Sequence, residues 1–251
     1  MAAGSLKLAS TTSAENSGLL DYLLPDFEKR YGLKVQVIAV GTGQAIKLGE
    51  NGDVDLILIH DRTAEDNFVK EGFGVCRNEV MYNDFVIVGP AEDPAEIRGV
   101  RDAVTAFKKI LSHRLYFISR GDNSGTHKKE MSLWKEAGLR PEGRWYLETG
   151  QGMGATLKIA DEKRAYLFSD RATYLSYKDK INLTVLFEGD KRLLNPYSLI
   201  AVNPRRHPKV RYKESRLFIE WIISDNVQRM IENYKKDGQA LFHSYVPSQC
   251  P

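Results

Sequence analysis

The chain has 251 residues, of which 42% are hydrophobic and 27% are charged, and its formal net charge is +3. This composition is typical of a globular protein and excludes a disordered or fibrous one. The near balance of 36 basic and 33 acidic residues gives no reason to expect nucleic acid as a partner. No apolar run approaches the roughly 20 residues that a membrane span needs, so we expect no direct membrane insertion.

Neither the first residues nor the cysteines identify a cellular compartment. The start of the chain lacks the charged and apolar parts of an export signal, and a signal that had been removed would leave no trace. The two cysteines, Cys76 and Cys250, match no metal or redox spacing. They leave two alternatives open, namely one disulfide in an exported protein or two unpaired thiols.

Strands that alternate with helices are predicted at the start of the chain. Such alternation is typical of a parallel, doubly wound sheet, in which ligands gather at the carboxyl ends of the strands. Pro25 is expected to kink or restart the first helix, and Gly32 to end it. The predicted strands are residues 6–9, 34–40 and 54–59, and the helices are residues 16–31, a helix that ends at 48, and residues 64–70.

Residues 81–88 predict a longer strand that crosses into a second lobe, and residues 194–202 predict the strand that returns. A final helix with an apolar core face is expected over residues 216–234. The sequence thus predicts two doubly wound α/β lobes joined by two crossing strands. Lobe 1 comprises residues 1–84 plus 198–251, lobe 2 comprises residues 85–197, and a ligand cleft lies between them.

Residues 119–127 are the strongest candidate site, because they connect a predicted strand to a predicted helix. The helix start leaves backbone N–H groups free, and the macrodipole there favours negative charge. Ser124 and Thr126 add hydroxyl donors, Gly125 lets the backbone approach a ligand closely, and Arg120 supplies a fork of donors. These groups predict a seat for an oxyanion. The alternative is that Ser124 only caps the helix and Arg120 pairs with a surface carboxylate.

Polar loops follow four of the predicted strands, at residues 10–13, 41–43, 119–127 and 149–154. Helix capping does not require hydroxyl groups on every such loop, so their repetition favours a common ligand. Two of the loops belong to each lobe. A ligand held between them would be enclosed from both sides, as in binding proteins that close about a hinge.

Residues 150–155 also fit the pattern G-x-G-x-x-A, and Asp170 lies twenty positions after Gly150, so this stretch imitates a dinucleotide fingerprint. The strand signal before it is short and is not the first of a βαβαβ series. The alternative is a glycine-rich helix start that packs close to the sheet.

No arrangement of residues predicts catalysis or a bound metal cation. His60, Asp61 and His127 have no metal-ligand spacing, and no Gly-x-Ser-x-Gly motif surrounds Ser124. His127 is expected to be a first-turn residue that hydrogen-bonds locally. Arg171 follows a predicted strand, and it is either a second cation for the ligand or the partner of Asp170 or another carboxylate.

Four stretches together resemble the tungstate-binding component of an ABC transporter: Ser-Thr-Thr-Ser (10–13), Ala-Val-Gly-Thr-Gly-Gln (39–44), residues 80–90, and residues 119–130. Arg120 followed by Ser124-Gly125-Thr126 is also similar to the anion loop of periplasmic phosphate-binding proteins. The resemblance covers nearly the whole chain. It implies a type II periplasmic binding-protein fold, with two α/β lobes, two crossing strands and the ligand in the cleft.

The resemblance also implies a ligand-binding set and no catalytic residues, cofactor or metal cation. Ser10 stands where the family pattern has another threonine, which changes a methyl group and keeps the hydroxyl. The implied ligand-binding residues are Thr11, Thr12, Thr42, Arg120, Ser124, Gly125 and Thr126, with Ser13, Gly152 and Arg171 as further candidates.

On this resemblance the chain is expected to capture tungstate between its lobes and to deliver it to a membrane ABC permease. We expect an exported monomer, either periplasmic or anchored outside the cell as a lipoprotein. Molybdate, then sulfate or phosphate, are alternative ligands, and an oxyanion-sensing regulatory domain or a nucleotide-dependent enzyme are alternatives of other classes. A cage of donors would reject phosphate because the phosphate proton needs a buried acceptor, for which Asp55 and Asp122 are candidates.

Overall fold

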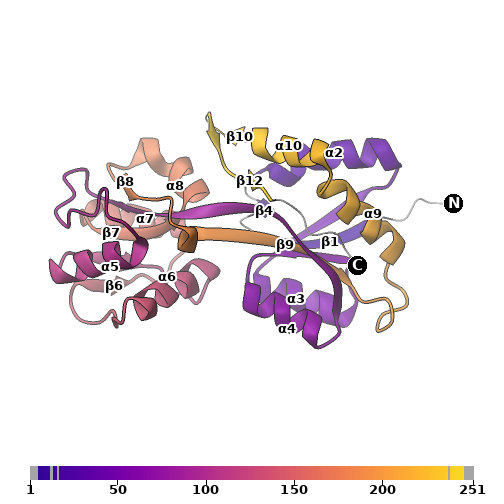
Figure 1. The fold of residues 1–251 in the computed structure, drawn as a ribbon, viewed down its shortest axis with the longest axis horizontal. Helices are drawn as coiled ribbons and strands as arrows, with labels where there is room; N and C mark the ends of the chain where they lie inside the picture. Colours follow the sequence, from indigo (N-terminus) through magenta and orange to yellow (C-terminus); the bar gives the residue numbers. More distant parts are fainter. Residues whose placement is uncertain (1–4, 12–13, 16, 237, 246–251) are drawn as a thin grey trace. The chain divides into compact units, whose positions relative to one another are not determined.

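The computed structural model describes residues 5–11, 14–15, 17–236 and 238–245 (Figure 1). It divides into two compact units, one of residues 1–82 plus 196–251 and the other of residues 83–195. The predicted lobe boundaries at 84 and 198 each lie two residues from these limits. Strands β4 (Gly74–Gly89) and β9 (Leu194–Val202) are neighbours in the sheet and run from one unit into the other.

Unit 1 is built on a sheet in the order β2-β1-β3-β9. Strands β1 (Leu6–Thr11), β2 (Val35–Val40) and β3 (Leu56–Ile59) are parallel, and β9 is antiparallel to β3. Because the three parallel strands point the same way, their carboxyl ends meet at one edge of the sheet. Ser10 and Thr11 of the first predicted polar loop are the last residues of β1 at this edge, and Gly41 of the second loop follows β2.

Helices cover both faces of the unit 1 sheet. Helices α3 (Thr42–Asn51) and α4 (Arg62–Lys70) supply Ala45 and Phe68 to a core that includes Ile57 and Ile200 of the sheet. Helix α2 (Leu19–Tyr31) contributes Phe27, whose ring lies 4.9 Å from that of Phe218 and 5.1 Å from that of Trp221 on α9 (Tyr212–Ile222).

Two expectations about these helices are corrected by the structure. Helix α2 does not restart at Pro25 but continues as one helix to Tyr31. Gly32 is its C-cap, as the sequence predicts, and its φ of 63° is the left-handed conformation that glycine adopts readily. The single helix expected over residues 216–234 is two helices, α9 and α10 (Asp225–Asn233). The break falls at Ser224, an N-cap residue type that favours a new helix start over a continued one.

Unit 2 contains the continuation of this sheet, in the order β4-β7-β5-β6. Strand β5 (Phe117–Ser119) is parallel to β6 (Tyr146–Glu148) and to β7 (Tyr166–Asp170), whereas β7 and β8 (Thr184–Phe187) are antiparallel to β4. Its helices are α5 (Ala103–Ser112), α6 (Gly125–Glu136), α7 (Met153–Glu162) and α8 (Arg171–Tyr177), and single 3₁₀ turns lie at Lys178–Lys180 and Lys191–Leu193.

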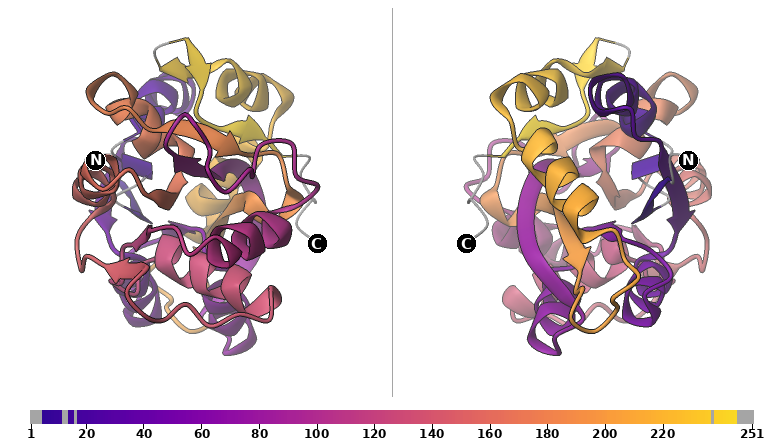
Figure 2. Two further views of the ribbon diagram at one scale, coloured as in Figure 1. Left: turned by 90° about the vertical axis from the view of Figure 1, so that its left-hand side faces the viewer. Right: turned by 90° about the vertical axis from the view of Figure 1, so that its right-hand side faces the viewer.

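An aromatic core fixes the position of α6 in unit 2. Helices α5 and α6 lie side by side (Figure 2), and the rings of Phe107 and Trp134 meet edge to face at 4.4 Å. Trp134 also contacts Phe117 of β5 at 5.2 Å between ring centroids. Helix α6 is therefore held against β5 by buried packing, which is the rigid support that a binding loop needs.

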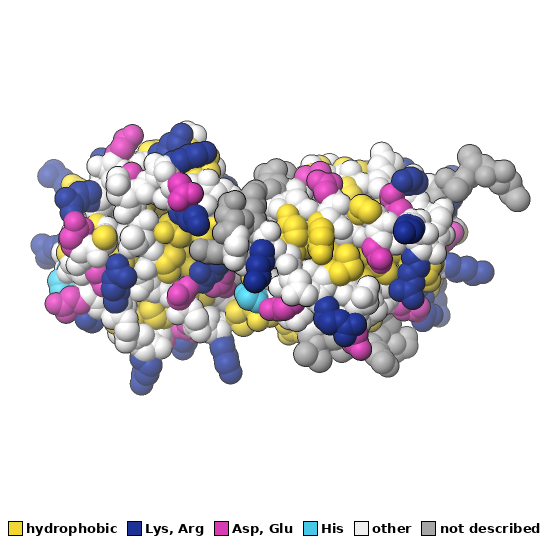
Figure 3. All heavy atoms as spheres, turned by 90° about the horizontal axis from the view of Figure 1, so that it is seen from above, with side chains coloured by type: hydrophobic (Ala, Val, Ile, Leu, Met, Phe, Trp, Pro, Cys, Tyr) yellow, Lys and Arg dark blue, Asp and Glu magenta, His cyan; other side chains and the backbone are white. Residues whose placement is uncertain are grey.

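The surface carries charges of both signs, and Cys76 forms a disulfide bond. Acidic and basic side chains are interspersed on the face shown in Figure 3. None of the helices among the described residues is long and apolar enough to cross a membrane. Cys76 is disulfide-bonded, the first of the two alternatives that the sequence left open. Cys250 lies outside the described residues.

Candidate functional site

In unit 2 the loops after β5 and β6 are joined to each other. The register pairs Ser119 with Glu148, so the residues that follow, Arg120 and Thr149, leave the sheet side by side. The N–H of Thr149 donates to the Ser119 carbonyl at 3.0 Å, and the N–H of Gly150 donates to the Arg120 carbonyl at 2.8 Å. These two bonds fix the backbone on both sides of Arg120.

The loop from Arg120 to Ser124 has a backbone shape that few residues allow. Gly121 has a φ of +61°, and a Cβ atom there would lie 2.6 Å from the Cβ of Glu148. Asn123 has a φ of +56°, in the left-handed region that asparagine tolerates better than most residues. The tight path of this loop therefore depends on glycine at position 121 and is not a generic connection.

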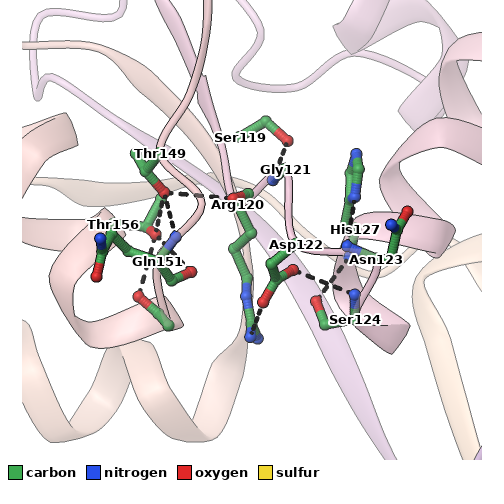
Figure 4. Close-up of polar contacts among 11 residues, drawn as sticks. Ser119, Arg120, Gly121, Asp122, Asn123, Ser124, His127, Thr149, Gln151 and Thr156 are labelled. Atoms are coloured by element: carbon green, nitrogen blue, oxygen red, sulfur yellow. Dashed lines mark hydrogen bonds and ion pairs between the residues drawn. The ribbon is translucent and has the colours of Figure 1, made fainter.

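Helix α6 begins directly after this loop, with Ser124 as its N-cap (Figure 4). The Ser124 Oγ accepts the N–H of His127 at 3.3 Å, and the N–H of Lys128 makes the first intrahelical bond, to the Ser124 carbonyl. The N–H groups of Gly125 and Thr126 lie between these positions, where a helix offers no carbonyl partner. They are the donors that a bound anion can use.

Arg120 and Asp122 point toward each other and form an ion pair between Nη2 and Oδ2 (Figure 4). The other Asp122 oxygen accepts the N–H of Ser124 at 3.2 Å. Burial by itself raises the pKa of Asp122, but the hydrogen bonds from Ser124 and the charge of Arg120 outweigh burial and lower it. Asp122 is therefore an ionised partner of Arg120.

The Nε atom of Arg120 is buried and has no hydrogen-bond partner among the described residues. A buried donor without an acceptor costs free energy in the folded state. Because this donor lies on the cation beside the open start of α6, it indicates a place where an acceptor belongs.

His127 confirms the local role expected from the sequence. Its Nδ1 accepts the N–H of Asn123 at 3.0 Å, which places the imidazole proton on Nε2 in the neutral ring. Nε2 lies 3.8 Å from a carboxylate oxygen of Glu148. Among the described residues, no group of three or more His, Cys, Asp or Glu side chains is arranged to hold a metal ion.

Arg171 lies at a different position on the same sheet edge. Its Nε and Nη2 donate to the two Asp84 oxygens at 2.7 and 2.6 Å, and Nη2 also lies 2.5 Å from Glu188. The hydrogen bonds to Asp84 raise the pKa of the guanidinium. The structure thus places Arg171 in the ion pair that the sequence left open as an alternative, with Asp84 and Glu188 in the place of Asp170.

In unit 1, two of the predicted hydroxyl residues, Thr11 and Thr42, lie at the carboxyl edge of the sheet. The register pairs Thr11 with Val40, so the end of β1 lies beside the loop that leads into Thr42, the first residue of α3. Thr11 is buried, and its Oγ1 accepts the N–H of Ala14 at 3.4 Å. Thr12 and Ser13, two further predicted site residues, lie outside the described residues.

Two other residues weighed in the sequence have clear positions in unit 1. Asp55 precedes β3 at the end of the strand opposite the polar loops, and its carboxylate accepts the N–H groups of Lys7 and Arg211, each at 2.8 Å. Asp55 therefore belongs to the fold and does not lie at the predicted ligand edge. His60 follows β3 at that edge, and its ring lies 4.6 Å from the ring of Tyr197.

The dinucleotide interpretation of residues 150–155 loses its support. Gly152 is the N-cap of α7, and β6 before it has three residues at the edge of the sheet. Asp170, which would have to bind a ribose, instead caps α8 by accepting the N–H and the hydroxyl of Thr173, both at 2.8 Å. A Cβ at Gly154 would lie 2.3 Å from the Tyr177 hydroxyl, so this glycine permits α7 and α8 to pack closely.

Two buried polar residues near these edges are not among the predicted ligand-binding residues. The Ser10 hydroxyl is buried at the end of β1 and has no partner among the described residues. Glu130 is 1% exposed on α6 and accepts hydrogen bonds from Ser119, Trp134 and Tyr146. The sequence could have predicted this role for Glu130. It lies four residues before Trp134 on the buried face of the helix, where an unpaired charge would be costly.

The chain resembles known proteins over almost its full length. Residues 2–226 match the model of the PBP superfamily domain. The tungstate-binding protein TupA of Peptoclostridium acidaminophilum is 49% identical over 245 residues, which cover 96% of this chain and 86% of that protein. A putative ABC transporter anion-binding protein of Haloferax volcanii is 45% identical over 251 residues, 98% of this chain and 73% of the relative.

Solved structures agree with these relatives. The tungstate-binding protein TupA from Desulfovibrio alaskensis G20 is 46% identical, with a TM-score of 0.92 over 98% of this chain and 100% of that chain. A structure described as the tungstate ABC transporter from Geobacter sulfurreducens is 52% identical, with a TM-score of 0.81 over 92% of this chain and 98% of that chain. The fold class and the family resemblance predicted from the sequence are confirmed.

Proposed function

We propose that this chain, which belongs to the PBP superfamily and within it to the family of TupA tungstate-binding proteins, captures tungstate and delivers it to an ABC permease. The proposal assigns it no catalytic role. The tungsten arrives as a tetrahedral oxyanion, so oxygen acceptors on the ligand must meet donors on the protein. The predicted donors are the hydroxyl groups of unit 1 together with Arg120 and the start of α6 in unit 2.

The orphaned Arg120 Nε carries this proposal. It is a buried, charged donor with no acceptor among the described residues, on the loop that leads into the first turn of α6. A charge-assisted hydrogen bond to an oxyanion would satisfy it and would be about twice as strong as a bond between neutral groups. The free N–H groups of Gly125 and Thr126 face the same kind of ligand, because the helix dipole favours negative charge at that end.

Asp122 places a negative charge beside Arg120 that opposes the binding of an anion there. Its lowered pKa keeps it ionised, and it is engaged by both Arg120 and the Ser124 backbone. A dianion that shares Arg120 with this carboxylate must be held by several further donors. Tungstate and molybdate carry no proton near neutral pH, whereas phosphate carries one that needs an acceptor. The preference for tungstate over molybdate rests on the names of the relatives.

Calorimetry with tungstate, molybdate, sulfate and phosphate tests the proposal directly. We expect saturable binding of tungstate, binding of molybdate as the next ligand, and weaker binding of sulfate and phosphate. Thermal unfolding with the same four ions provides a second measurement, because a ligand that binds the folded state raises the melting temperature by mass action. An unchanged melting curve with all four ions would exclude an oxyanion-binding function.

Delivery to a permease, export and a monomeric state belong to the same proposal. The superfamily and the ABC transporter relatives support a periplasmic binding component. Pull-down of a candidate ABC permease, with and without tungstate, tests the partner, and light scattering tests the monomer. If the permease does not bind the tungstate-loaded protein, the proposed role in transport would be wrong, whereas the proposed binding of tungstate would be unaffected.

A further inference from the structure

Glu130 lies behind the predicted anion loop and is connected to it through a chain of hydrogen bonds. The Ser119 hydroxyl donates to Glu130 Oε2 at 2.8 Å and accepts the N–H of Gly121 at 3.3 Å. Arg120 lies between Ser119 and Gly121 in the chain. The orientation of the Ser119 hydroxyl, and through it the turn at Gly121, therefore depends on the acceptor that Glu130 provides.

The other oxygen of Glu130 has two donors of its own. Oε1 accepts the indole N–H of Trp134 at 3.1 Å and the hydroxyl of Tyr146 at 2.8 Å. These three donors hydrogen-bond to the carboxylate, but none of them carries a positive charge. They therefore offset only part of the cost of burying the ionised form. Burial raises the pKa of Glu130 to about 7, despite the hydrogen bonds from Ser119, Tyr146 and Trp134, which lower it.

The same surroundings accommodate a protonated Glu130. Tyr146 has an alternative acceptor, since its hydroxyl also lies 3.7 Å from the sulfur of Met131. A proton on Oε1 can therefore be donated to the Tyr146 oxygen while the Tyr146 hydroxyl turns to Met131, and Ser119 continues to donate to Oε2. The site thus accepts either protonation state without losing the bond that holds the loop.

A bound dianion would act on this carboxylate at short range. Glu130 is five residues after Gly125 on α6, which corresponds to about 7.5 Å along the helix axis. Two like charges at such a distance in a partly buried region repel each other, so a dianion at the start of α6 favours the neutral form of Glu130.

We propose that Glu130 is a positioning residue that holds the Arg120 loop through Ser119 and that takes up a proton when an oxyanion binds at the start of α6. The proposal rests on the proposed function and goes beyond it by coupling ligand affinity to pH. Above neutral pH the uptake costs more, so affinity for a dianion declines as pH rises.

Other ionisable groups face this region and have to be separated from Glu130. Tyr146 and Glu148 approach from β6, and the charge of Glu148 also raises the pKa of Glu130. His127 lies one turn earlier on α6, with Nε2 3.8 Å from Glu148. Asp122 is ionised on the loop itself.

Calorimetry with tungstate, from about pH 6.5 to pH 8.5 and in buffers of different ionisation enthalpy, tests the proposal. For the wild-type protein we expect proton uptake on binding and an affinity that falls about threefold to tenfold across this range. Glu130→Gln keeps the size of the side chain but cannot titrate, so it should bind without uptake and with a flat profile. Glu148→Gln and His127→Gln are matched controls and should retain the uptake.

Ser119→Ala separates positioning from proton uptake, because it breaks the link to Gly121 and keeps Glu130. It should weaken binding at every pH and retain proton uptake by Glu130, over a range moved to higher pH, because the Ser119 hydrogen bond that lowers the pKa of Glu130 is lost. Wild-type protein that binds tungstate without proton uptake would overturn this inference and leave the proposed function standing, as would uptake that persists in Glu130→Gln. Failure of the wild-type protein to bind any oxyanion would instead remove the proposed function. If Glu130→Gln does not fold, the wild-type proton count and Ser119→Ala still decide the question.

Discussion

Two arginines of unit 2 follow neighbouring strands and have different surroundings. Arg120, after β5, pairs with one carboxylate, Asp122, two residues away, and leaves Nε buried without a partner among the described residues. Arg171, after β7, binds both oxygens of Asp84 and also contacts Glu188. Each guanidinium side chain is about 20% exposed, so exposure does not distinguish them.

The number of partners, and not the position at the sheet edge, separates the two roles. Arg171 forms ion pairs with two carboxylates, and none of its nitrogen atoms is among the buried atoms that lack a hydrogen-bond partner within the described residues. Its charge is therefore balanced by groups of the protein itself. Arg120 keeps a donor that only an added acceptor can satisfy. A cation that serves a ligand must be held in place but not saturated, and Asp122 achieves this for Arg120 with one ion pair.

The largest expected effect is on ligand affinity at Arg120. Arg120→Ala removes the predicted charge-assisted bonds to the ligand, and truncation of such a buried partner costs about 2–5 kcal/mol. We expect tungstate affinity to fall by about 30-fold or more, measured by calorimetry. Arg120→Lys is the matched control and should retain part of the affinity, because it keeps the charge but not the fork. Near wild-type affinity in Arg120→Ala would contradict the comparison.

Arg171→Ala should affect stability more than binding. It leaves Asp84, whose side chain is 15% exposed, without its partner, and we expect a loss of about 1–3 kcal/mol in the free energy of unfolding. Urea denaturation measures this loss, and calorimetry on the same variant should give tungstate affinity within a few-fold of wild type. A drop in affinity as large as that of Arg120→Ala would mean that Arg171 reaches the ligand.

Asp122→Asn tests whether the single partner of Arg120 restrains anion binding. The amide oxygen can still accept the N–H of Ser124, while the negative charge beside the ligand is removed. We expect tungstate to bind a few-fold more tightly, or about 1 kcal/mol, by calorimetry. Weaker binding would show that the ion pair is needed to orient Arg120 more than its charge opposes the ligand.

The smallest effect is expected at the second partner of Arg171. Glu188 is 54% exposed, and exposed ion pairs contribute about 0–1 kcal/mol. Glu188→Gln should therefore lower the free energy of unfolding by less than about 1 kcal/mol, with tungstate affinity unchanged. Thermal unfolding at low and high salt measures it, and a larger loss would show that Arg171 depends on both carboxylates.

Local patterns explain why most elements were predictable. The alternation of apolar strands and helices depends on neighbouring residues, so the sequence indicates β9 with the bounds that the structure has. The break between α9 and α10 was missed because the apolar face continues across Ser224, and helical spacing alone does not register a cap. Helix α2 tolerates Pro25 because packing of its buried face outweighs one lost backbone bond.

The candidate site was predictable where it consists of contiguous residues. The N-cap at Ser124, the helix start after it and the nearby cation are all within residues 120–126. The partners of Arg171 were not predictable, because Asp84 is 87 residues away. Antiparallel pairing of Phe85 with Asp170 brings Asp84 beside Arg171, and that register is a property of the sheet.

By itself the sequence determined the fold class, the loops that follow the strands and the resemblance to oxyanion-binding proteins, because each depends on residues close together in the chain. Only the tertiary structure decided which polar groups are already satisfied. It placed Asp55 at the far end of β3, joined Arg171 to Asp84 and buried Glu130 behind the loop of Arg120. The physical reason is that the hydrogen-bond and charge partners of a side chain come from distant segments of the chain. A charged side chain with a structural role can be told from one that binds a ligand only when these partners are known.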